Sequence, residues 1–277
     1  MPELPEVETV RCGLAPRLEG KTLVKAKAFR PDIRFPIPEN LESALVGKEV
    51  SNVKRRAKYI LIEVSNGPTI ILHLGMSGRI FITTEKPFPP LLKHDHVMFE
   101  TKEGSRITFN DPRRFGFLIF SDTGNIDDHK FFKDMGPEPL GNSFSGPILF
   151  KRLMGKKSTI KAALLDQRTV AGLGNIYVSE ALNRAGVSPL RLAGSLKIRE
   201  AEGLTKQIKQ VLTEALEAGG SSLRDFKAVD GELGYFQHRF KVYGQEGKPC
   251  SNLKCKGKIL KIVQSNRSSF YCPKCQK

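Results

Sequence analysis

The first twenty residues show the hydrophobic pattern of an amphipathic helix. Apolar side chains recur three or four positions apart, at Val7, Val10, Leu14 and Leu18. Residues at this spacing share one face of a helix. Glutamates occupy the first turn and Gly20 lies just beyond the last turn, as is typical of helix ends. The pattern predicts a helix over residues 5–18, with Cys12 inside it as a buried or half-buried small hydrophobe.

A different pattern begins at residue 22 and continues to about residue 122. Short segments rich in Ile, Val, Phe and Thr alternate with Gly, Asn and Pro. Short strands at such spacing are typical of an antiparallel sandwich or barrel. The predicted strands span residues 59–64, 69–74, 79–83, 97–100, 106–109 and 116–120. We expect the first helix to pack against this sheet structure.

The remainder of the chain is mainly helical in pattern. Residues 135–147 are dense in Gly, Pro, Asn and Ser and predict a hinge. Helices are expected at residues 148–154, 159–166, 175–184 and 196–218, the last ending at Gly219-Gly220. The predicted fold class is α+β. It comprises an N-terminal domain (1–134), the hinge, a helical domain (148–240) and a small C-terminal module (241–277).

Composition and charge narrow the class of partner. The chain has 39% hydrophobic residues and a formal net charge of +16, so it can bury a core and favours a polyanion. Its basic residues are spread through structured sequence, which favours a shaped nucleic-acid surface. A ribosomal protein would carry the same charge, so charge alone gives only the partner class. Without a membrane-length apolar run or a signal-peptide start, a cytoplasmic, nucleoid-associated protein is expected.

Four cysteines in the last 28 residues predict a metal site. Their pattern is Cys250-x4-Cys255-x16-Cys272-x2-Cys275, with two strand-like segments in the long insert. Four thiolates at such spacing suit a closed tetrahedral zinc site, and so short a module has too little core to fold without the ion. Arg267 lies near the tip of the expected hairpin. Zinc ribbons of this kind also occur in proteins that are not enzymes, so the module indicates nucleic-acid binding only.

The first six residues, MPELPE, offer catalytic chemistry. Removal of Met1 leaves Pro2 with a free secondary amine. An α-amine has a pKa of about 8 and a lysine one of about 10.4, so at neutral pH roughly a hundredfold more of the terminal amine is in the unprotonated, nucleophilic form. Glu3 and Glu6 are candidates for moving protons to and from such a nucleophile. The alternative interpretation is an ordinary chain end that frays in solvent.

Several further patches combine cations with turns. They are the basic run Lys54, Arg55, Arg56 and Lys58; LGMSG (74–78), which projects Met76; and NDPRRFG (110–116), with two arginines and Phe115. Each one alone fits a solvated charge run or an ordinary turn. Together they are typical of proteins that hold phosphates and intrude into a base stack.

Two segments of the helical part are candidates for ligand contact. Residues 170–175 (VAGLGN) combine close-approach glycines with a helix start, which favours an anion site. A dinucleotide fingerprint is excluded because the third glycine and the preceding strand are missing. Residues 221–240 form a polar connection long enough to be a functional loop, although an ordinary surface loop fits equally well.

Taken together, these motifs resemble the formamidopyrimidine-DNA glycosylase family. The likeness rests on MPELPEVETV, Lys58, LGMSG, NDPRRFG, VAGLGNIYVSEALNRAGVSP and the finger ending SSFYCPKCQ, in the same order along the whole chain. It implies a β-sandwich, a helix–two-turn–helix domain and a zinc finger, with DNA in the cleft between domains. The x4 spacing of the first cysteine pair departs from the commoner x2 and concerns only the loop shape.

The resemblance also implies roles for matching residues. Pro2 would attack C1′ of the damaged nucleotide and form a Schiff base, with Glu3 as proton donor and Lys58 at the lesion phosphates. Met76, Arg113 and Phe115 would fill the space left by the extruded base. Backbone phosphates would be held by His94, Lys161, Asn175 and Arg267. Lesion recognition would involve Glu6, Ser221, Ser222, Arg224 and Tyr235, and one structural zinc ion would be held by the four cysteines.

The resemblance predicts a monomeric enzyme that acts on double-stranded DNA containing oxidised purines or abasic sites. It would remove 8-oxoguanine and formamidopyrimidines and then cut the strand by β,δ-elimination. Two alternatives stay open at this point. One is a glycosylase for oxidised pyrimidines, similar to endonuclease VIII, although Leu4 favours the purine branch. The other is a non-catalytic zinc-finger DNA-binding protein of the same fold.

Overall fold

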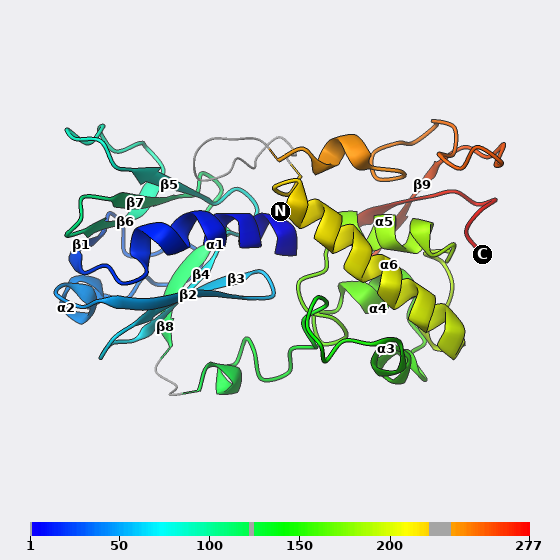
Figure 1. Ribbon diagram of the computed structural model, residues 1–277, viewed down its shortest axis with the longest axis horizontal. Helices are drawn as coiled ribbons and strands as arrows, with labels where there is room; N and C mark the ends of the chain where they lie inside the picture. Colours follow the sequence, from blue (N-terminus) through cyan, green and yellow to red (C-terminus); the bar gives the residue numbers. More distant parts are fainter. Residues whose placement is uncertain (1, 122–124, 222–233) are drawn as a thin grey trace. The chain divides into compact units, whose positions relative to one another are not determined.

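The structure, a computed structural model, describes residues 2–121, 125–221 and 234–277. It divides the chain into two compact units (Figure 1). The N-terminal unit contains residues 1–133 and 218–235, and the C-terminal unit contains residues 134–217 and 236–277. The finer division expected from the sequence, with a hinge at 135–147 and a separate finger from residue 241, stays a prediction.

Helix α1 (Leu4–Leu18) confirms the first expected helix. Its apolar face, formed by Val7, Val10, Leu14 and Leu18, is buried in the core of the N-terminal unit. The expectation for Cys12 was wrong, because its side chain is exposed. Cys12 is two residues from Val10, and two residues turn a helix by about 200°. Its side chain therefore lies on the face opposite to the core.

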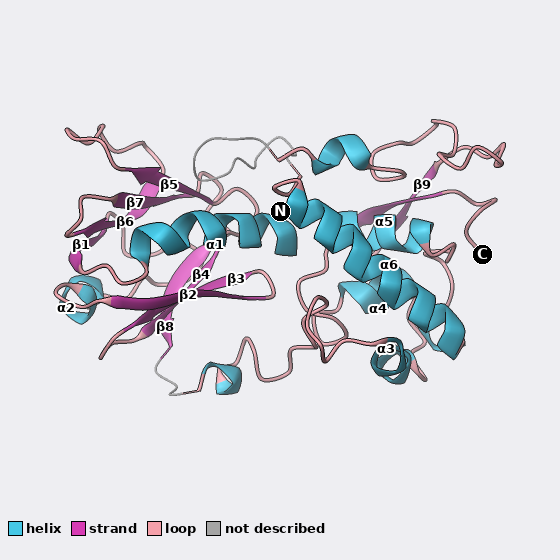
Figure 2. Cartoon of the chain, in the orientation of Figure 1, coloured by secondary structure: helices cyan, strands magenta, loops and turns pink. Residues whose placement is uncertain are grey.

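Two four-stranded antiparallel sheets enclose that core (Figure 2). The first has the order β1-β6-β7-β5 and the second the order β2-β3-β4-β8. The strands of the first are β1 (Leu23–Ala28), β6 (Asp95–Thr101), β7 (Arg106–Asn110) and β5 (Arg79–Thr83). Those of the second are β2 (Val50–Arg56), β3 (Tyr59–Val64), β4 (Thr69–His73) and β8 (Phe117–Ser121). The expected antiparallel sandwich is confirmed, whereas β1, β2 and the short helix α2 (Leu41–Leu45) were not foreseen.

The C-terminal unit is built mainly from helices. These are α3 (Gly146–Leu153), α4 (Ile160–Leu165), α5 (Asn175–Arg184) and α6 (Ile198–Glu217). All four lie where the sequence predicted helices, within two residues at each end. Gly219 and Gly220 follow α6 with φ of 69° and 81°. This left-handed backbone is characteristic of glycine after a helix.

The same unit ends in an antiparallel hairpin formed by β9 (Leu260–Gln264) and β10 (Arg267–Tyr271). Its two-residue turn, Ser265-Asn266, has φ of 48° and 58°. Short 3-10 helices at Ile126–Asp128, Ala193–Ser195 and Phe236–Arg239 complete the secondary structure. Within the described ranges, none of the helices is long and apolar enough to cross a membrane.

Candidate active site, metal centre and nucleic-acid interface

The start of α1 is anchored, not frayed. Pro2 is buried, and Glu3 is the N-cap of the helix. The backbone N–H of Glu3 donates to Glu6 Oε2 at 2.8 Å, and the Glu3 side chain accepts in return from the N–H of Glu6. This reciprocal capping box satisfies two N–H groups that the helix itself leaves unpaired. The Glu-x-x-Glu spacing was a signal for it that the sequence reasoning did not use.

Glu6 also joins α1 to the segment that follows α6. Its Oε1 accepts from the backbone N–H of Ser221 at 2.8 Å and from the Ser221 hydroxyl at 2.9 Å. Ser221 forms a β-bridge with Tyr235, whose own ring is exposed. Glu6, Ser221 and Tyr235 are therefore brought together at the base of the 222–233 segment. Ser222 and Arg224, the other two expected lesion contacts, lie outside the described residues.

Part of the basic run has a structural function. Arg55 Nε donates to Glu8 Oε2 at 2.8 Å and so pins α1 to strand β2. Lys54 Nζ lies 2.8 Å from Glu63 Oε1 on the neighbouring strand. Arg55 and Lys54 therefore have carboxylate partners within the N-terminal unit, and the role of the run at phosphates stays a prediction.

Lys58 lies in the tight turn between β2 and β3. Its side chain is buried, and Ala57 before it has φ of 52°. The nearby His73 is half-buried, and its Nδ1 accepts from the backbone N–H of Gly75 at 3.1 Å. Burial, helped by the positive charges of Lys58 and Arg34, lowers the pKa of His73 to about 4. His73 is therefore neutral at physiological pH, as its acceptor role requires.

The two glycine-containing turns of the N-terminal unit are packed against each other. We call residues 74–78 and 110–116 the wedge turns. Gly75 has φ of 62°, and a Cβ there would lie only 2.3 Å from the backbone nitrogen of Gly116. At their tips Met76, Arg113 and Phe115 are all exposed, and the Arg113 guanidinium lies 5.1 Å from the centre of the Phe115 ring. The structure thus brings these three predicted residues together.

Asp111 holds both wedge turns and was missed by the sequence reasoning. It is fully buried. Its Oδ1 accepts from the Ser77 hydroxyl in the first turn, and its Oδ2 accepts from the Gly116 N–H in the second turn at 2.7 Å. A buried carboxylate of this kind needs such donors. The Asp-Pro pair in the second turn indicated a turn, but nothing local indicated the bond to Ser77.

His94 lies beside the second wedge turn. It is half-buried, and its carbonyl oxygen accepts from the Asp111 N–H at 3.0 Å. The imidazole lines a surface pocket of about 520 Å³ with Arg30, Lys93 and Arg114. The three cations outnumber the one carboxylate that also lines this pocket, Asp95, which makes it suitable for a phosphate group.

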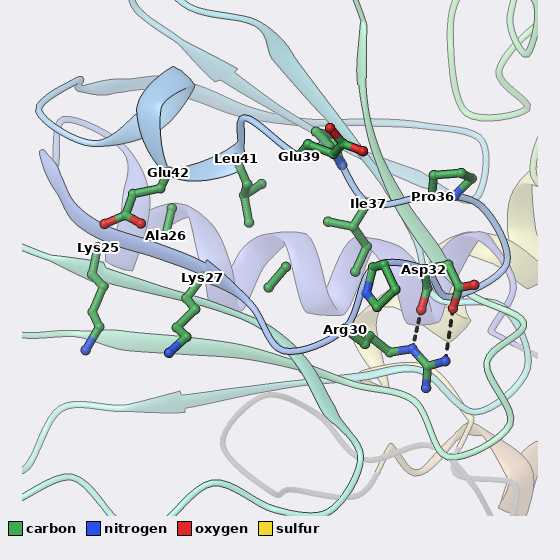
Figure 3. Close-up of a pocket in the computed structure, with 13 residues that line it drawn as sticks. Lys25, Ala26, Lys27, Arg30, Asp32, Pro36, Ile37, Glu39, Leu41 and Glu42 are labelled. Atoms are coloured by element: carbon green, nitrogen blue, oxygen red, sulfur yellow. Dashed lines mark hydrogen bonds and ion pairs between the residues drawn. The ribbon is translucent and has the colours of Figure 1, made fainter.

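A larger pocket of about 650 Å³ lies between β1 and the loop before α2 (Figure 3). Lys25, Lys27 and Arg30 line it together with Asp32 and Glu42. Arg30 hydrogen-bonds to Asp32, so positive and negative groups are mixed there. None of the residues expected to be catalytic lines this pocket.

The four cysteines of the C-terminal unit converge. Their Sγ atoms all lie within 4.8 Å of one another, and the Cys250–Cys275 and Cys255–Cys272 pairs are 3.7 Å apart. Tetrahedral Zn–S bonds of about 2.3 Å require sulfur separations of about 3.8 Å. A Cβ on Gly257 would lie 2.9 Å from Cys272 Sγ, so only glycine fits there. The residues present fit one structural zinc ion.

The residues expected at phosphates in and around the hairpin differ in exposure and in contacts. Arg267 is exposed beside the hairpin turn. Lys161 is 1% exposed and donates to Ser268 O at 2.8 Å and to Ser269 Oγ at 2.6 Å. Asn175 Nδ2 donates to the same Ser268 oxygen at 2.9 Å. Lys161 and Asn175 therefore hold the hairpin, and their expected contacts with phosphates stay predictions.

Two further side chains, the half-buried Gln167 and the buried Glu180, organise loops and were not foreseen. Gln167 Oε1 accepts from the Gly172 N–H at 2.8 Å, while its Nε2 donates to Leu173 O at 2.9 Å, so this one residue shapes the turn before α5. Glu180 accepts from the backbone N–H groups of three successive residues, Lys241, Val242 and Tyr243. It fixes the segment that leads into the finger.

Three family models match consecutive parts of the chain. Residues 1–118 match the formamidopyrimidine-DNA glycosylase N-terminal domain and residues 135–227 the H2TH domain of the same enzyme. Residues 247–277 match the zinc finger found in FPG and IleRS.

Full-length relatives give the same result. The chain is 53% identical to the formamidopyrimidine-DNA glycosylase of Ruegeria pomeroyi and 54% identical to that of a Jannaschia species, with 100% of each chain covered. A Lactococcus lactis FPG mutant in complex with Fapy-dG DNA has a TM-score of 0.90 at 34% identity, over 100% of both chains. MutM (FPG) of Thermus thermophilus has a TM-score of 0.86 at 38% identity, over 99% of this chain and 98% of that one.

The fold, the cysteine centre and these matches define a zinc-finger DNA glycosylase. Within that class, the chain belongs to the formamidopyrimidine-DNA glycosylase family.

Proposed function

We propose that this protein excises oxidised purines, namely 8-oxoguanine and formamidopyrimidines, from double-stranded DNA and then cuts the strand at the abasic site. It acts as a monomer on DNA in the cytoplasmic nucleoid. Family membership supports the class of substrate. The solved relatives include complexes with Fapy-dG DNA, with abasic-site DNA and with carbocyclic 8-oxo-G DNA.

The anchored start of α1 carries the proposal. Buried Pro2 is next to Glu3, and Glu3 is held by the capping box with Glu6. A nucleophile on a fixed helix end is presented in one orientation, which lowers the entropic barrier to attack. While Met1 is attached, the Pro2 nitrogen is an amide without a basic lone pair. Activity therefore requires removal of Met1.

The chemistry follows from a free Pro2 amine. Its lone pair attacks C1′, the bond from C1′ to the base breaks, and the base leaves with a proton. Glu3 donates a proton to O4′ as the sugar ring opens, and the amine loses its own proton, which leaves an iminium ion. Loss of a C2′ proton then expels the 3′ phosphate, and a second elimination expels the 5′ phosphate. Lys58 stabilises the phosphates at the lesion, and water at last releases Pro2.

Access to C1′ requires the damaged nucleotide to leave the stack. Met76, Arg113 and Phe115 fill the space that it leaves, with Arg113 opposite the orphan cytosine. The mutual packing of the wedge turns supports this, because it presents all three tips together. Apolar wedges of this kind offset part of the unstacking cost.

The other assignments complete the proposal. His94, Asn175 and Arg267 hold backbone phosphates, and the burial of Lys161 makes its contribution indirect. Glu6, Ser221, Ser222, Arg224 and Tyr235 form the site that recognises the extruded base. The domain boundaries at residues 134, 147 and 240 separate the catalytic, hinge, helical and finger parts.

Borohydride trapping tests the catalytic step. The wild-type protein, shown by intact mass to lack Met1, is incubated with a duplex containing 8-oxoguanine opposite cytosine. We expect a covalent protein–DNA product, whereas Pro2→Gly should give at least about 100-fold less because it lacks the cyclic secondary amine. Pro5→Ala is the matched control, since it alters the other proline of the same turn and should trap normally.

Three outcomes would contradict separate parts of the proposal. A wild-type protein that binds the duplex without trapping indicates a non-catalytic DNA-binding protein. Faster excision of thymine glycol than of 8-oxoguanine assigns the pyrimidine branch. Equal trapping by Pro2→Gly and wild type shows that the cyclic secondary amine of Pro2 is not required.

A further inference from the structure

The buried ammonium of Lys161 links a helix to the zinc hairpin. Lys161 lies on α4, and its acceptors, Ser268 O and Ser269 Oγ, both lie on β10. Taking an ammonium out of water is unfavourable unless polar partners replace the lost hydration. The hairpin supplies such partners from its backbone and from a serine that is itself 0% exposed. The contact therefore depends on the hairpin staying in this position.

These acceptors belong to a larger hydrogen-bond network that includes residues of both strands next to the turn. Ser269 Oγ donates to Gln264 Oε1 at 2.6 Å, and Gln264 is the last residue of β9. Gln264 Nε2 donates to Pro189 O at 3.2 Å in the helical part of the unit. Asn175, the first residue of α5, shares the Ser268 oxygen with Lys161. The network thus fixes the hairpin to α4, α5 and the loop after α5.

This network can determine the orientation of Arg267. Arg267 pairs directly with Gln264 across the hairpin and immediately precedes Ser268. The Arg267 side chain is exposed, so the direction in which it points depends on the position of the hairpin backbone. The zinc ion fixes the opposite end of the hairpin, because the cysteines nearest to the strands are Cys255 before β9 and Cys272 after β10.

We propose that Lys161 is a positioning residue for DNA binding that acts through Arg267, and that it makes no phosphate contact of its own. This inference rests on the proposed function, in which Arg267 holds a backbone phosphate. Without the Lys161 anchor, the hairpin tip samples several orientations while the zinc site stays intact. Arg267 then has to be ordered when DNA binds, which weakens its contact.

A double-mutant cycle tests the coupling. The dissociation constant for lesion duplex is measured over a range of salt concentrations for wild type, Lys161→Met, Arg267→Ala and the double variant. We expect each single variant to bind about 5- to 10-fold more weakly. The double variant should match Arg267→Ala within about twofold, since residues that act through one contact are not additive. Both Arg267→Ala and the double variant should lose about one phosphate from the salt dependence.

Two more variants complete the design. Ser269→Ala removes an acceptor of Lys161 without removing any cation, so its loss of affinity should also vanish in the Arg267→Ala background. Lys157→Met, at an exposed lysine just before α4, is the matched charge control, and its effect should multiply with that of Arg267→Ala. Zinc content per chain is measured throughout. If Lys161→Met loses zinc, the Ser269→Ala cycle decides.

The outcomes separate the inference from the proposed function. If the effects of Lys161→Met and Arg267→Ala multiply, and the salt dependence falls by about two phosphates, Lys161 touches DNA and the inference is overturned. If Arg267→Ala binds like wild type, Arg267 makes no contact with a phosphate, and the inference is overturned as well. Borohydride trapping through Pro2 is independent of both results.

Discussion

The wedge turns and the zinc hairpin present similar side chains on supports of opposite kinds. The wedge turns carry Arg113 and belong to a unit with a large core, to which both sheets and α1 contribute. The hairpin carries Arg267 on a finger whose buried cluster, among the described residues, consists of Val242, Ile259 and Cys272, with Phe270 and three cysteines packed against it. In the first case one buried carboxylate, Asp111, is enough to fix the backbone. In the second, a metal site and anchors from neighbouring helices replace the missing core.

The comparison shows what each support can tolerate. A turn that packs on a large core is still supported when one polar contact is lost, so the structural change stays local. A finger without a core loses its structure when its metal is removed. Four changes test this contrast, and we give them in order of decreasing expected effect.

Zinc removal should have the largest effect. A strong chelator should unfold residues 247–277 and weaken binding to lesion DNA by at least about 100-fold, because structural zinc supplies about 10 kcal/mol or more of folding free energy. The N-terminal unit should keep its own thermal transition. Calorimetry and amide hydrogen exchange measure the two parts separately.

Cys272→Ser should reproduce the effect of the chelator, and Cys12→Ser should not, since Cys12 is exposed and far from the cysteine cluster in sequence. Persistent protection of β9 and β10 after complete zinc loss would show that the helices alone support the hairpin.

Asp111→Asn should have the next largest effect. It replaces an acceptor by a donor opposite the Gly116 N–H, and a buried unpaired donor costs about 1–3 kcal/mol. We expect 8-oxoguanine excision from duplex DNA to fall about 10- to 100-fold. Cleavage of a ready-made abasic site should fall less, because no base has to be displaced there. Rates on both substrates, together with the melting temperature, measure the change.

The exposed Asp128 supplies the control, and Asp128→Asn should leave both rates unchanged. Equal losses on the two substrates would mean that Asp111 supports the catalytic site as a whole, not the wedge turns in particular.

His73 should make the N-terminal unit sensitive to acid. Burial lowers its pKa from 6.5 to about 4, so below pH 6.5 the unfolded chain takes up a proton that the folded unit refuses. Its free energy of unfolding should therefore fall between pH 6.5 and about 4, by up to about 3 kcal/mol. His73→Asn keeps an acceptor near Gly75 and should flatten this dependence.

Urea unfolding at a series of pH values measures this effect. His238→Asn, at an exposed histidine of the C-terminal unit, is the control and should not alter the profile. An unchanged slope in His73→Asn would assign the acid sensitivity to another group.

The hairpin turn should give the smallest effect. Ser265 has φ of 48°, and glycine adopts this conformation without steric cost. Ser265→Gly should therefore stabilise the zinc-bound hairpin by a few tenths of a kcal/mol to about 1 kcal/mol. Hydrogen exchange of the Ser269 amide, in a hydrogen-bonded pair with Ile262, measures it, with Ser251→Gly as a control outside the hairpin. A loss of protection would show that the serine side chain contributes to the turn.

Much of the fold was predictable from local patterns. The buried face of α1, the strands with alternating side chains and the cysteine spacing all gave correct elements. Strands β1 and β2 were missed for a shared reason. Each begins with a register shift, between Leu23 and Lys25 and between Val50 and Asn52. Their buried residues are consequently three positions apart instead of two, so the alternation that marks a strand is absent.

The residues of the site were predictable only where they belong to a short sequence motif. Asp111, Gln167, Glu180 and the Lys161 network act through bonds to backbone groups that the fold brings close. No spacing along the chain marks such bonds. The burial of Lys161 depends in the same way on a hairpin more than a hundred residues further along the chain.

The tie between Glu6 and Ser221 has a consequence for how this protein can evolve. Ser221 and Tyr235 are bridged at the base of the intervening segment, and Glu6 bonds Ser221 to the helix that bears Pro2. Ser221 and Tyr235 are therefore tied to the start of α1 through contacts between described residues. We expect this pair to vary little during evolution, and Gly234 beside it admits no side chain, because a Cβ there would lie 2.4 Å from the Gly220 carbonyl oxygen.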